Sequence, residues 1–209
     1  MDFLQLELKQ VELPFGKIIY QSKYGQGISS ETAELISELL KHEERADFRV
    51  LELGSGIGIM SLMLKHYRQS WSISGIEIQK HLVEISQENS RLAEENVNFY
   101  EADLRTYSEI DKFDLIVTNP PYYKVNESRI SPSKERAIAR HELLCKMSDV
   151  IAAIRRNLSN CGRAYLLYPQ NREEELLEVV GTMNMKLDKI REVSSLKKNR
   201  VIIYRIELK

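Results

Sequence analysis

The stretch Val50-Leu51-Glu52-Leu53-Gly54-Ser55-Gly56-Ile57-Gly58 decides the fold, because it indicates a buried strand, a glycine-rich turn and the start of a helix. The apolar residues 59–64 continue that helix. Glycines let the backbone turn tightly and approach a ligand closely, and a helix amino end leaves N–H groups to bind it. The spacing Gly-x-Gly-x-Gly differs from the Gly-x-Gly-x-x-Gly of dinucleotide-binding folds. Glu52 precedes the turn, so the loop would repel a pyrophosphate and attract a cationic ligand.

Acidic residues also follow the next two predicted strands. The strand expected over 71–76 ends at Glu77, where a carboxylate can accept hydrogen bonds from both hydroxyls of a ribose. The strand expected over 97–100 is followed by Asp103, which can accept from an adenine amino group. Together with Glu52, these acids end three successive strands. The pattern therefore predicts a nucleoside-containing ligand that lies across one edge of a sheet.

A fourth buried strand is predicted by Phe113-Asp114-Leu115-Ile116-Val117-Thr118, and Asn119-Pro120-Pro121-Tyr122 follows it directly. Ligands of open α/β sheets bind at the carboxyl ends of the strands, where this amide and this aromatic ring would lie. Proline has no N–H and a fixed φ, so the Pro-Pro pair holds its carbonyls in place without adding donors. The set suits a planar amide or an aromatic amine as ligand. Taken alone, the four residues are also typical of an ordinary turn.

Taken together, the glycine loop, Glu77, Asp103 and Asn119-Pro120-Pro121-Tyr122 resemble the S-adenosylmethionine-dependent methyltransferases of the Asn-Pro-Pro-Tyr group. Within this group the chain is most similar to the tRNA adenine-N6 methyltransferases that modify the adenine beside the anticodon of a valine tRNA. The features that point to this branch are Tyr122-Tyr123, Ala139-Arg140-His141-Glu142 and the leader Gly16-Lys17-Ile18-Ile19-Tyr20-Gln21. The resemblance runs from about Phe15 to the last strand. One departure is Ser29-Ser30-Glu31, where the branch usually has a Gly/Ser-x-Asp element.

The resemblance implies S-adenosyl-L-methionine as cofactor and methyl transfer to the exocyclic N6 of an adenine in tRNA. The implied cofactor-binding residues are Glu52, Gly54, Gly56, Gly58, Glu77, Ile78, Asp103, Leu104 and Asn119. The implied catalytic residues are Asn119, Pro120, Pro121 and Tyr122. The Asn119 side-chain oxygen and the Pro120 carbonyl would accept the two amine N–H bonds and stabilise the charge that develops on the nitrogen. Tyr122 would stack on the base.

Other functions stay open beside this one. Release-factor glutamine methyltransferases use the same four residues, because a side-chain amide resembles the amino edge of a base. They usually carry a separate helical amino-terminal domain, whereas about 48 residues precede the glycine loop here. Adenine or guanine in rRNA or DNA is another acceptor for the same chemistry. A non-catalytic nucleic-acid-binding module is the alternative from a different class, and the intact loop and Asn119–Tyr122 motif argue against it.

Charge is segregated along a chain whose formal net charge is −1. Residues 186–209 hold eight Lys/Arg against three Asp/Glu, and residues 124–140 hold five against two. The rest of the chain is therefore acidic, as expected of an RNA-facing rim on an acidic body. Solvated cations on edge strands are the alternative interpretation. The candidate substrate-binding residues are Tyr123, Lys124, Arg129, Arg136, Arg140, Lys197, Lys198 and Arg200.

Composition bounds the class of protein. With 209 residues and 43% apolar content, the chain is expected to form one domain, with a leader over 1–28 and a catalytic core over 29–209. Cys145 and Cys161 form no Cys-x-x-Cys pair, so neither a disulfide nor a metal site is expected. Residues 1–9 do not resemble a signal peptide, and no apolar run reaches the ~20 residues of a membrane span. We expect a cytoplasmic protein; its oligomeric state is not indicated.

Hydrophobic periodicity completes the expected fold. A helix from about Ser133 would carry the apolar residues between Leu143 and Ile154 and end at Gly162, and Ser30 would cap the helix over 30–42. The remaining expected elements are strands over 5–13, 17–20, 49–53, 163–168, 185–193 and 201–208 and helices over 57–67, 79–94 and 171–183. Alternating strands and helices closed by an antiparallel pair predict the α/β class: a class I, Rossmann-like, mostly parallel seven-stranded sheet with a terminal hairpin.

Overall fold

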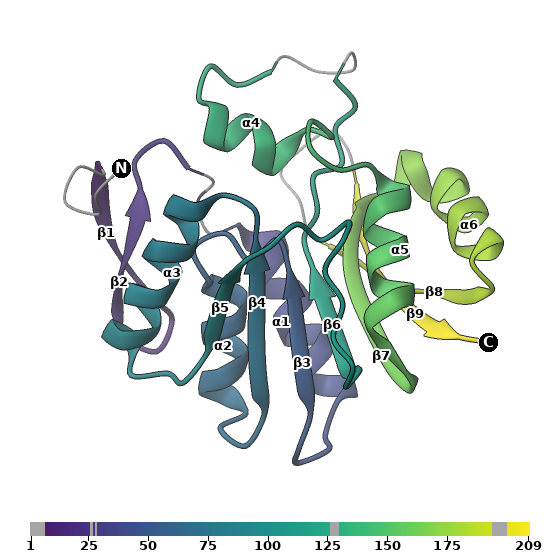
Figure 1. Cartoon of the computed structure of the whole chain (residues 1–209), viewed down its shortest axis with the longest axis horizontal. Helices are drawn as coiled ribbons and strands as arrows, with labels where there is room; N and C mark the ends of the chain where they lie inside the picture. The colour runs from purple at the N-terminus through teal and green to yellow at the C-terminus, as the bar shows by residue number, and fades with distance from the viewer. Residues whose placement is uncertain (1–6, 26, 28, 126–129, 194–199) are drawn as a thin grey trace.

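The computed structural model describes residues 7–25, 27, 29–125, 130–193 and 200–209. Its centre is a seven-stranded sheet of order β5-β4-β3-β6-β7-β9-β8 (Figure 1). The parallel strands are β3 (Arg49–Leu53), β4 (Ser72–Glu77), β5 (Asn98–Glu101), β6 (Phe113–Thr118) and β7 (Leu158–Pro169). β9 (Val201–Leu208) runs antiparallel to β7 and to β8 (Met185–Val193). The predicted mostly parallel sheet with a terminal antiparallel hairpin is confirmed.

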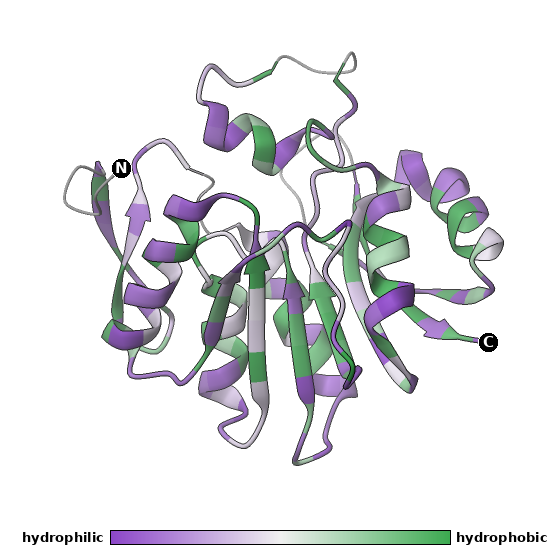
Figure 2. Ribbon diagram, viewed as in Figure 1, coloured by the Kyte–Doolittle hydropathy of each residue, from purple (hydrophilic) through white to green (hydrophobic). Residues whose placement is uncertain are grey.

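Helices cover both faces of this sheet. α1 (Ser30–His42), α2 (Ile59–Tyr67) and α3 (Lys80–Ala93) pack on one face, and α5 (Met147–Asn157) and α6 (Glu173–Thr182) on the other. Side chains alternate along each strand, so Val50 belongs to the first core and its neighbour Leu51 to the second. Figure 2 shows the result, with apolar central strands and polar outer surfaces on the helices. A sheet buried on both faces leaves only its edges and strand ends available for ligands.

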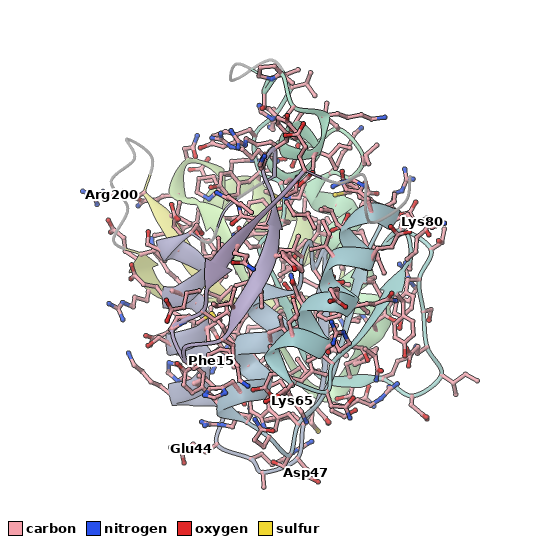
Figure 3. All side chains as sticks on the ribbon, turned by 90° about the vertical axis from the view of Figure 1, so that its left-hand side faces the viewer. Phe15, Glu44, Asp47, Lys65, Lys80 and Arg200 are labelled. Carbon is pink, nitrogen blue, oxygen red and sulfur yellow. The ribbon has the colours of Figure 1, made fainter. Side chains whose placement is uncertain are left out.

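The leader forms the predicted antiparallel pair, β1 (Leu8–Glu12) and β2 (Ile18–Ser22). It is anchored by Asn89 of α3, whose amide accepts from the Tyr20 N–H (2.7 Å) and donates to the Tyr20 carbonyl (2.9 Å) and the Ile57 carbonyl (3.0 Å). Phe15 lies at the turn of the hairpin and is labelled in Figure 3. Its ring stacks on that of His66, with ring centroids 3.9 Å apart. The buried Asn89 thus joins the leader to the loop that follows β3.

The single helix predicted from Ser133 is wrong. The structure has a short α4 (Lys134–Arg140), a turn, and then α5. The chain leaves the helix at His141 because it pairs with Tyr123 instead: the Tyr123 N–H donates to the Arg140 carbonyl (3.0 Å), and the Glu142 N–H to the Tyr123 carbonyl (2.9 Å). A distant segment therefore supplies the hydrogen bonds that a continuous helix would have made internally.

Two further details of the helix ends differ from the sequence prediction. α5 ends at Asn157, and Gly162 lies within β7 rather than at the helix end. A Cβ at Gly162 would lie 2.9 Å from the Phe113 carbonyl oxygen, so close approach to β6 is the reason for glycine there. At α1 the capping residue is Ser29, not Ser30: its Oγ accepts from the Thr32 N–H at 3.2 Å.

Within the described ranges, no helix has the length and apolarity needed to cross a membrane. The same part of the chain holds no group of three or more His, Cys, Asp or Glu side chains arranged to bind a metal ion.

Candidate active site

A cavity of about 210 Å³ lies at the carboxyl ends of the parallel strands, where β3 and β6 meet at the reversal of strand order. Most of the predicted site residues line it together: Glu52, Gly54, Gly56, Glu77, Ile78, Asp103, Leu104, Asn119, Pro120, Pro121, Tyr122, Tyr123 and Arg140. Gly58 does not line it. The tertiary fold therefore brings the four motifs of the sequence into one site.

The glycine loop after β3 owes its shape to left-handed backbone. Gly54, Gly56 and Gly58 have φ values of 69°, 53° and 87°. A Cβ at Gly58 would lie 2.5 Å from the Phe99 ring, so this glycine is required for packing beneath the loop. Open space lies beside the Cα atoms of Gly54 and Gly56, which border the cavity. The loop thus has two glycines that border the cavity and one that packs against the core.

Glu52 is buried at the start of the loop. Its carboxylate accepts hydrogen bonds from the Ser61 N–H (3.0 Å) and the Ser61 hydroxyl, in the first turn of α2. Burial raises the pKa of Glu52 to about 8, and the nearby Glu77 carboxylate acts in the same direction. Glu52 therefore holds the first turn of α2 in place. A cation bound in the cavity would favour the ionised form of Glu52.

Glu77, at the end of β4, is also nearly buried. Its two carboxylate oxygens accept from the Gly56 N–H (3.1 Å) and the Gln79 N–H (2.9 Å). Burial raises the pKa of Glu77, and the hydrogen bonds from Gln79 and Gly56 oppose this shift. The carboxylate thus joins the end of β4 to the glycine loop, beside the cavity where a ribose is expected.

Asp103 follows β5 and is held by its neighbour Arg105. The Asp103 carboxylate accepts from Nη2 (2.5 Å) and Nε (2.9 Å) of the Arg105 guanidinium and from the Arg105 N–H (2.9 Å). Hydrogen bonding to Arg105 lowers the pKa of the Asp103 carboxyl, so this group stays ionised. Arg105 occupies part of the hydrogen-bonding capacity of both Asp103 oxygens, and Asp103 lines the cavity.

The Asn119–Tyr122 motif is fixed from both sides. Nδ2 of Asn119 donates to Oγ1 of Thr32 in α1 (3.1 Å). The Tyr122 ring lies 4.8 Å from the Tyr123 ring centroid, and burial raises the pKa of the Tyr122 phenol above its usual value. On the other side, Arg172 donates to the Tyr122 carbonyl (3.0 Å). Contacts with Thr32, Tyr123 and Arg172 therefore hold the Asn119 amide and the Tyr122 ring in place beside the cavity.

α4 and the leader close one side of the cavity, and α4 lies above the carboxyl edge of the sheet in Figure 1. Glu135 accepts from the Ser22 hydroxyl (2.8 Å) and lies 3.3 Å from Nε2 of His81, while Arg136 donates to the Gly25 carbonyl (3.1 Å). Sequence reasoning missed several residues that line the cavity: Thr32, Glu135, Ile138, Ala139, Leu144 and Cys145. Thr32 directly follows Ser29-Ser30-Glu31, and Ala139 belongs to Ala139-Arg140-His141-Glu142, so the sequence had singled out the surroundings of these two residues.

The predicted substrate-binding cations have several different surroundings. Arg140 lies over the Tyr123 ring, with its guanidinium carbon 5.3 Å from the ring centroid. Lys124 pairs with Glu175 (2.9 Å), and Arg200 with Glu192 (3.4 Å). Figure 3 shows Arg200 at the left-hand side of that view, far from Lys80. Arg129, Lys197 and Lys198 lie outside the described residues.

The basic carboxyl-terminal segment is extensively ion-paired. Lys189 pairs with Glu173 (3.0 Å), and Arg191 with Glu38 (3.2 Å). Asp188 pairs with both Lys186 (3.0 Å) and Arg205 (2.9 Å). Among the described residues of this segment, Lys189 and Arg191 are thus paired with acids outside it, whereas Arg140 lies beside the cavity.

The chain is similar in sequence to a known family and to two known enzymes. The family model described as the methyltransferase small domain matches residues 25–144. A release factor glutamine methyltransferase of Lactococcus lactis is 28% identical over 65% of this chain and 53% of its own length. A tRNA1(Val) (adenine(37)-N6)-methyltransferase of Aeromonas hydrophila is 33% identical over 62% of this chain and 55% of its own. The chain thus spans about half the length of these relatives.

The fold is shared with solved structures. The T. thermophilus 16S rRNA N2 G1207 methyltransferase, determined in complex with AdoMet and guanosine, superposes with a TM-score of 0.69. It has 17% sequence identity, and the match covers 97% of this chain and 50% of that one. At this identity the likeness concerns the fold alone.

Proposed function

The chain belongs to the methyltransferase small domain family, and from that premise we propose that it transfers a methyl group to the exocyclic N6 of an adenine in tRNA. S-adenosyl-L-methionine is the cofactor and supplies the methyl group. The observation that carries the proposal is that Glu77, Asp103, Asn119 and Tyr122 line the same cavity. We further propose that residues 29–209 act as one catalytic domain, with 1–28 as its leader, in the cytoplasm.

The residues of the cavity fit this cofactor. The open space beside Gly54 and Gly56 admits the methionine part against the loop backbone. Glu77 and Asp103 retain acceptor capacity for the ribose hydroxyls and the adenine amine, respectively. Glu52 provides a buried carboxyl group whose ionisation a bound cation would favour. Glu52, Glu77 and Asp103 lie at or just beyond the carboxyl ends of the neighbouring strands β3, β4 and β5, respectively. A nucleoside that lies across this edge of the sheet could contact all three.

The chemistry requires placement of the acceptor amine. An adenine amine is a poor nucleophile because its lone pair is delocalised into the ring. With its two N–H bonds accepted by the Asn119 side-chain oxygen and the Pro120 carbonyl, the nitrogen can turn its lone pair toward the methyl group. The same acceptors stabilise the positive charge that develops as the N–C bond forms. The partly buried Tyr122 ring provides a stacking surface for the base.

The aromatic surroundings favour a base over a side-chain amide as the acceptor. Tyr122 and Tyr123 form a tilted pair beside the cavity, and Arg140 lies over Tyr123. Such a combination of rings and a guanidinium suits a nucleotide, because bases stack on aromatic faces and the phosphate attracts the cation. Glutamine of a release factor is the second candidate acceptor, supported by the similarity to the Lactococcus lactis enzyme.

The decisive experiment compares acceptors directly. The protein is incubated with labelled S-adenosylmethionine and, separately, undermodified tRNA, total rRNA, DNA and release factor, with Asn119→Ala as control. We expect label in tRNA that digestion and mass spectrometry identify as N6-methyladenosine, and none with the control. Label confined to release factor would replace the proposal by glutamine methylation. Label in no acceptor, with the cofactor bound normally, would overturn methyl transfer to any of these acceptors.

A further inference from the structure

The side-chain amide of Asn119 has two chemically opposite ends. Its oxygen can accept a hydrogen bond from an amine, whereas its NH₂ group can only donate. If the NH₂ group faced the acceptor, it would oppose the amine N–H bonds and the positive charge that develops on the nitrogen. The proposed reaction therefore depends on which way the amide is turned.

Thr32 contacts the NH₂ end of this amide. Nδ2 of Asn119 donates to the Thr32 Oγ1 at 3.1 Å, across 87 positions of sequence. Asn119 follows β6, and Thr32 lies in the first turn of α1. Both residues line the cavity and both are half-buried. The start of α1 thus touches the catalytic motif at the one group that must not face the acceptor.

A hydroxyl can donate as well as accept, so the neighbours of Thr32 matter for its direction. The Oγ of Ser29 accepts from the Thr32 N–H (3.2 Å) and lies 3.1 Å from the Thr32 Oγ1. When the Thr32 hydroxyl donates to Ser29, its lone pairs are left for Nδ2 of Asn119. The reverse direction would make Thr32 donate to the Asn119 oxygen and turn the NH₂ group toward the acceptor. The positive charge that develops on the acceptor nitrogen is stabilised by the Asn119 oxygen and not by its NH₂ group. It therefore favours the arrangement in which the Thr32 hydroxyl donates to Ser29.

We propose that Thr32 is a positioning residue, which holds the NH₂ group of Asn119 and thereby directs the Asn119 oxygen at the acceptor nitrogen. This inference rests on the proposed function, because it assigns a task to the same motif. It also gives the cap of α1 a role in the reaction: Ser29 sets the direction of the Thr32 hydroxyl. The chain of contacts runs from the helix cap through Thr32 to the reacting centre.

Three variants test the proposal. Thr32→Val keeps the size of the side chain but removes the acceptor, Thr32→Ser keeps the hydroxyl, and Ser30→Ala changes an exposed neighbour in the same turn. We expect Thr32→Val to lower the single-turnover rate about threefold to tenfold, as the loss of one hydrogen bond predicts, with cofactor Kd unchanged within about twofold. Thr32→Ser should restore most of the rate, and Ser30→Ala should match the unchanged protein.

A second readout does not depend on turnover. In ¹⁵N-asparagine-labelled protein, the side-chain NH₂ signals of Asn119, assigned by their loss in Asn119→Asp, report its hydrogen bond directly. These signals should shift in Thr32→Val and not in Ser30→Ala. Unchanged signals, or a Thr32→Val rate equal to that of the unchanged protein, would overturn the inference. If the unchanged protein methylates no acceptor while the signals shift as expected, the proposed function fails and the contact stands as structural only.

Discussion

Arg172 donates from its guanidinium to the main-chain carbonyl of Tyr122 at 3.0 Å and is itself buried. The same guanidinium binds Glu142 (2.5 Å) and, through two hydrogen bonds, Glu175 (2.6 and 3.0 Å). Glu142 also accepts from the Met147 N–H at the start of α5 (3.2 Å). One side chain therefore ties the segment before α6 to the catalytic motif and to the turn between α4 and α5.

Replacement of Arg172 by Met should destabilise the fold and slow methyl transfer together. The change leaves Glu142 buried without its cation, and breaking a buried pair typically costs about 3–5 kcal/mol. Urea unfolding measures the free energy, and single-turnover kinetics measure the rate. The matched control is Lys124→Met, which removes the exposed partner of the same Glu175 and should cost less than about 1 kcal/mol. Equal losses of unfolding free energy in the two variants would contradict the greater contribution assigned to the buried Arg172.

Glu77→Ala should weaken cofactor binding by about 1–3 kcal/mol, because it removes both the acceptor for the ribose and the partner of the Gly56 N–H. Titration calorimetry with S-adenosylmethionine measures the change. Glu101→Ala is the control, since Glu101 lies directly beside Glu77 at the end of the neighbouring strand, is exposed and does not line the cavity. Affinity that is unaltered in Glu77→Ala would exclude the ribose assignment.

Asn119→Ala should reduce methyl transfer about 100-fold or more while cofactor affinity stays nearly unchanged, because its contacts with the acceptor strengthen in the transition state. Tyr122→Phe should keep most of the activity and Tyr122→Ala should lose it, since the ring and not the hydroxyl stacks on the base. Steady-state kinetics with tRNA as acceptor measure all three. Near-normal turnover in Asn119→Ala would show that the amine is oriented by other groups.

Glu52 should make stability fall as pH rises. Its pKa in the folded protein is about 8 against an ordinary 4.5, so between these values the folded protein keeps a proton that the unfolded chain releases. Ionisation of Glu52 therefore favours the unfolded state. The resulting loss of unfolding free energy is complete above pH 8. Glu52→Gln cannot ionise, and its carbonyl can still accept from Ser61. Relative to the unchanged protein, the variant should gain about 2 kcal/mol or more between pH 5 and pH 9.

Urea unfolding at pH 5, 7 and 9 checks this prediction. Only the difference between the two proteins is used, so the titration of groups distant from Glu52 cancels, and the difference reports Glu52 together with its coupling to Glu77. A difference that stays constant with pH would mean that Glu52 is already ionised in the folded protein at pH 5.

Arg140→Ala should weaken tRNA binding and flatten its salt dependence by about 0.7–0.9 in the log–log slope, as the loss of one phosphate contact predicts. The control is Arg191→Ala, because Arg191 is already paired with Glu38 (3.2 Å) and Glu34 (3.7 Å). Filter binding across a salt series measures both variants. A slope changed by Arg191→Ala and not by Arg140→Ala would place the RNA on the carboxyl-terminal hairpin and not beside α4.

The sequence by itself determined the sheet and the core of the candidate site. Runs such as 113–118 are mostly apolar because a strand covered on both faces has almost no solvent side, and this signal is local. Glu52, Glu77, Asp103 and Asn119 each lie at or just beyond the carboxyl end of a strand, and parallel strands end at one edge, so their convergence could be predicted without coordinates.

Only the tertiary structure decided how that site is held and closed. The predicted long helix from Ser133 breaks because Tyr123, which lies outside it, donates to the Arg140 carbonyl and accepts from the Glu142 N–H. Thr32 and Arg172 lie 87 and 50 positions from the motif residues that they contact, and no local pattern marks either contact. Ion pairing is equally non-local: Lys189 and Arg191, counted as positive charge along residues 186–209, pair with Glu173 and Glu38 of distant helices. Local periodicity indicates which face of a helix or strand is buried. The contact partner of a side chain depends instead on which distant elements pack against it in the folded protein.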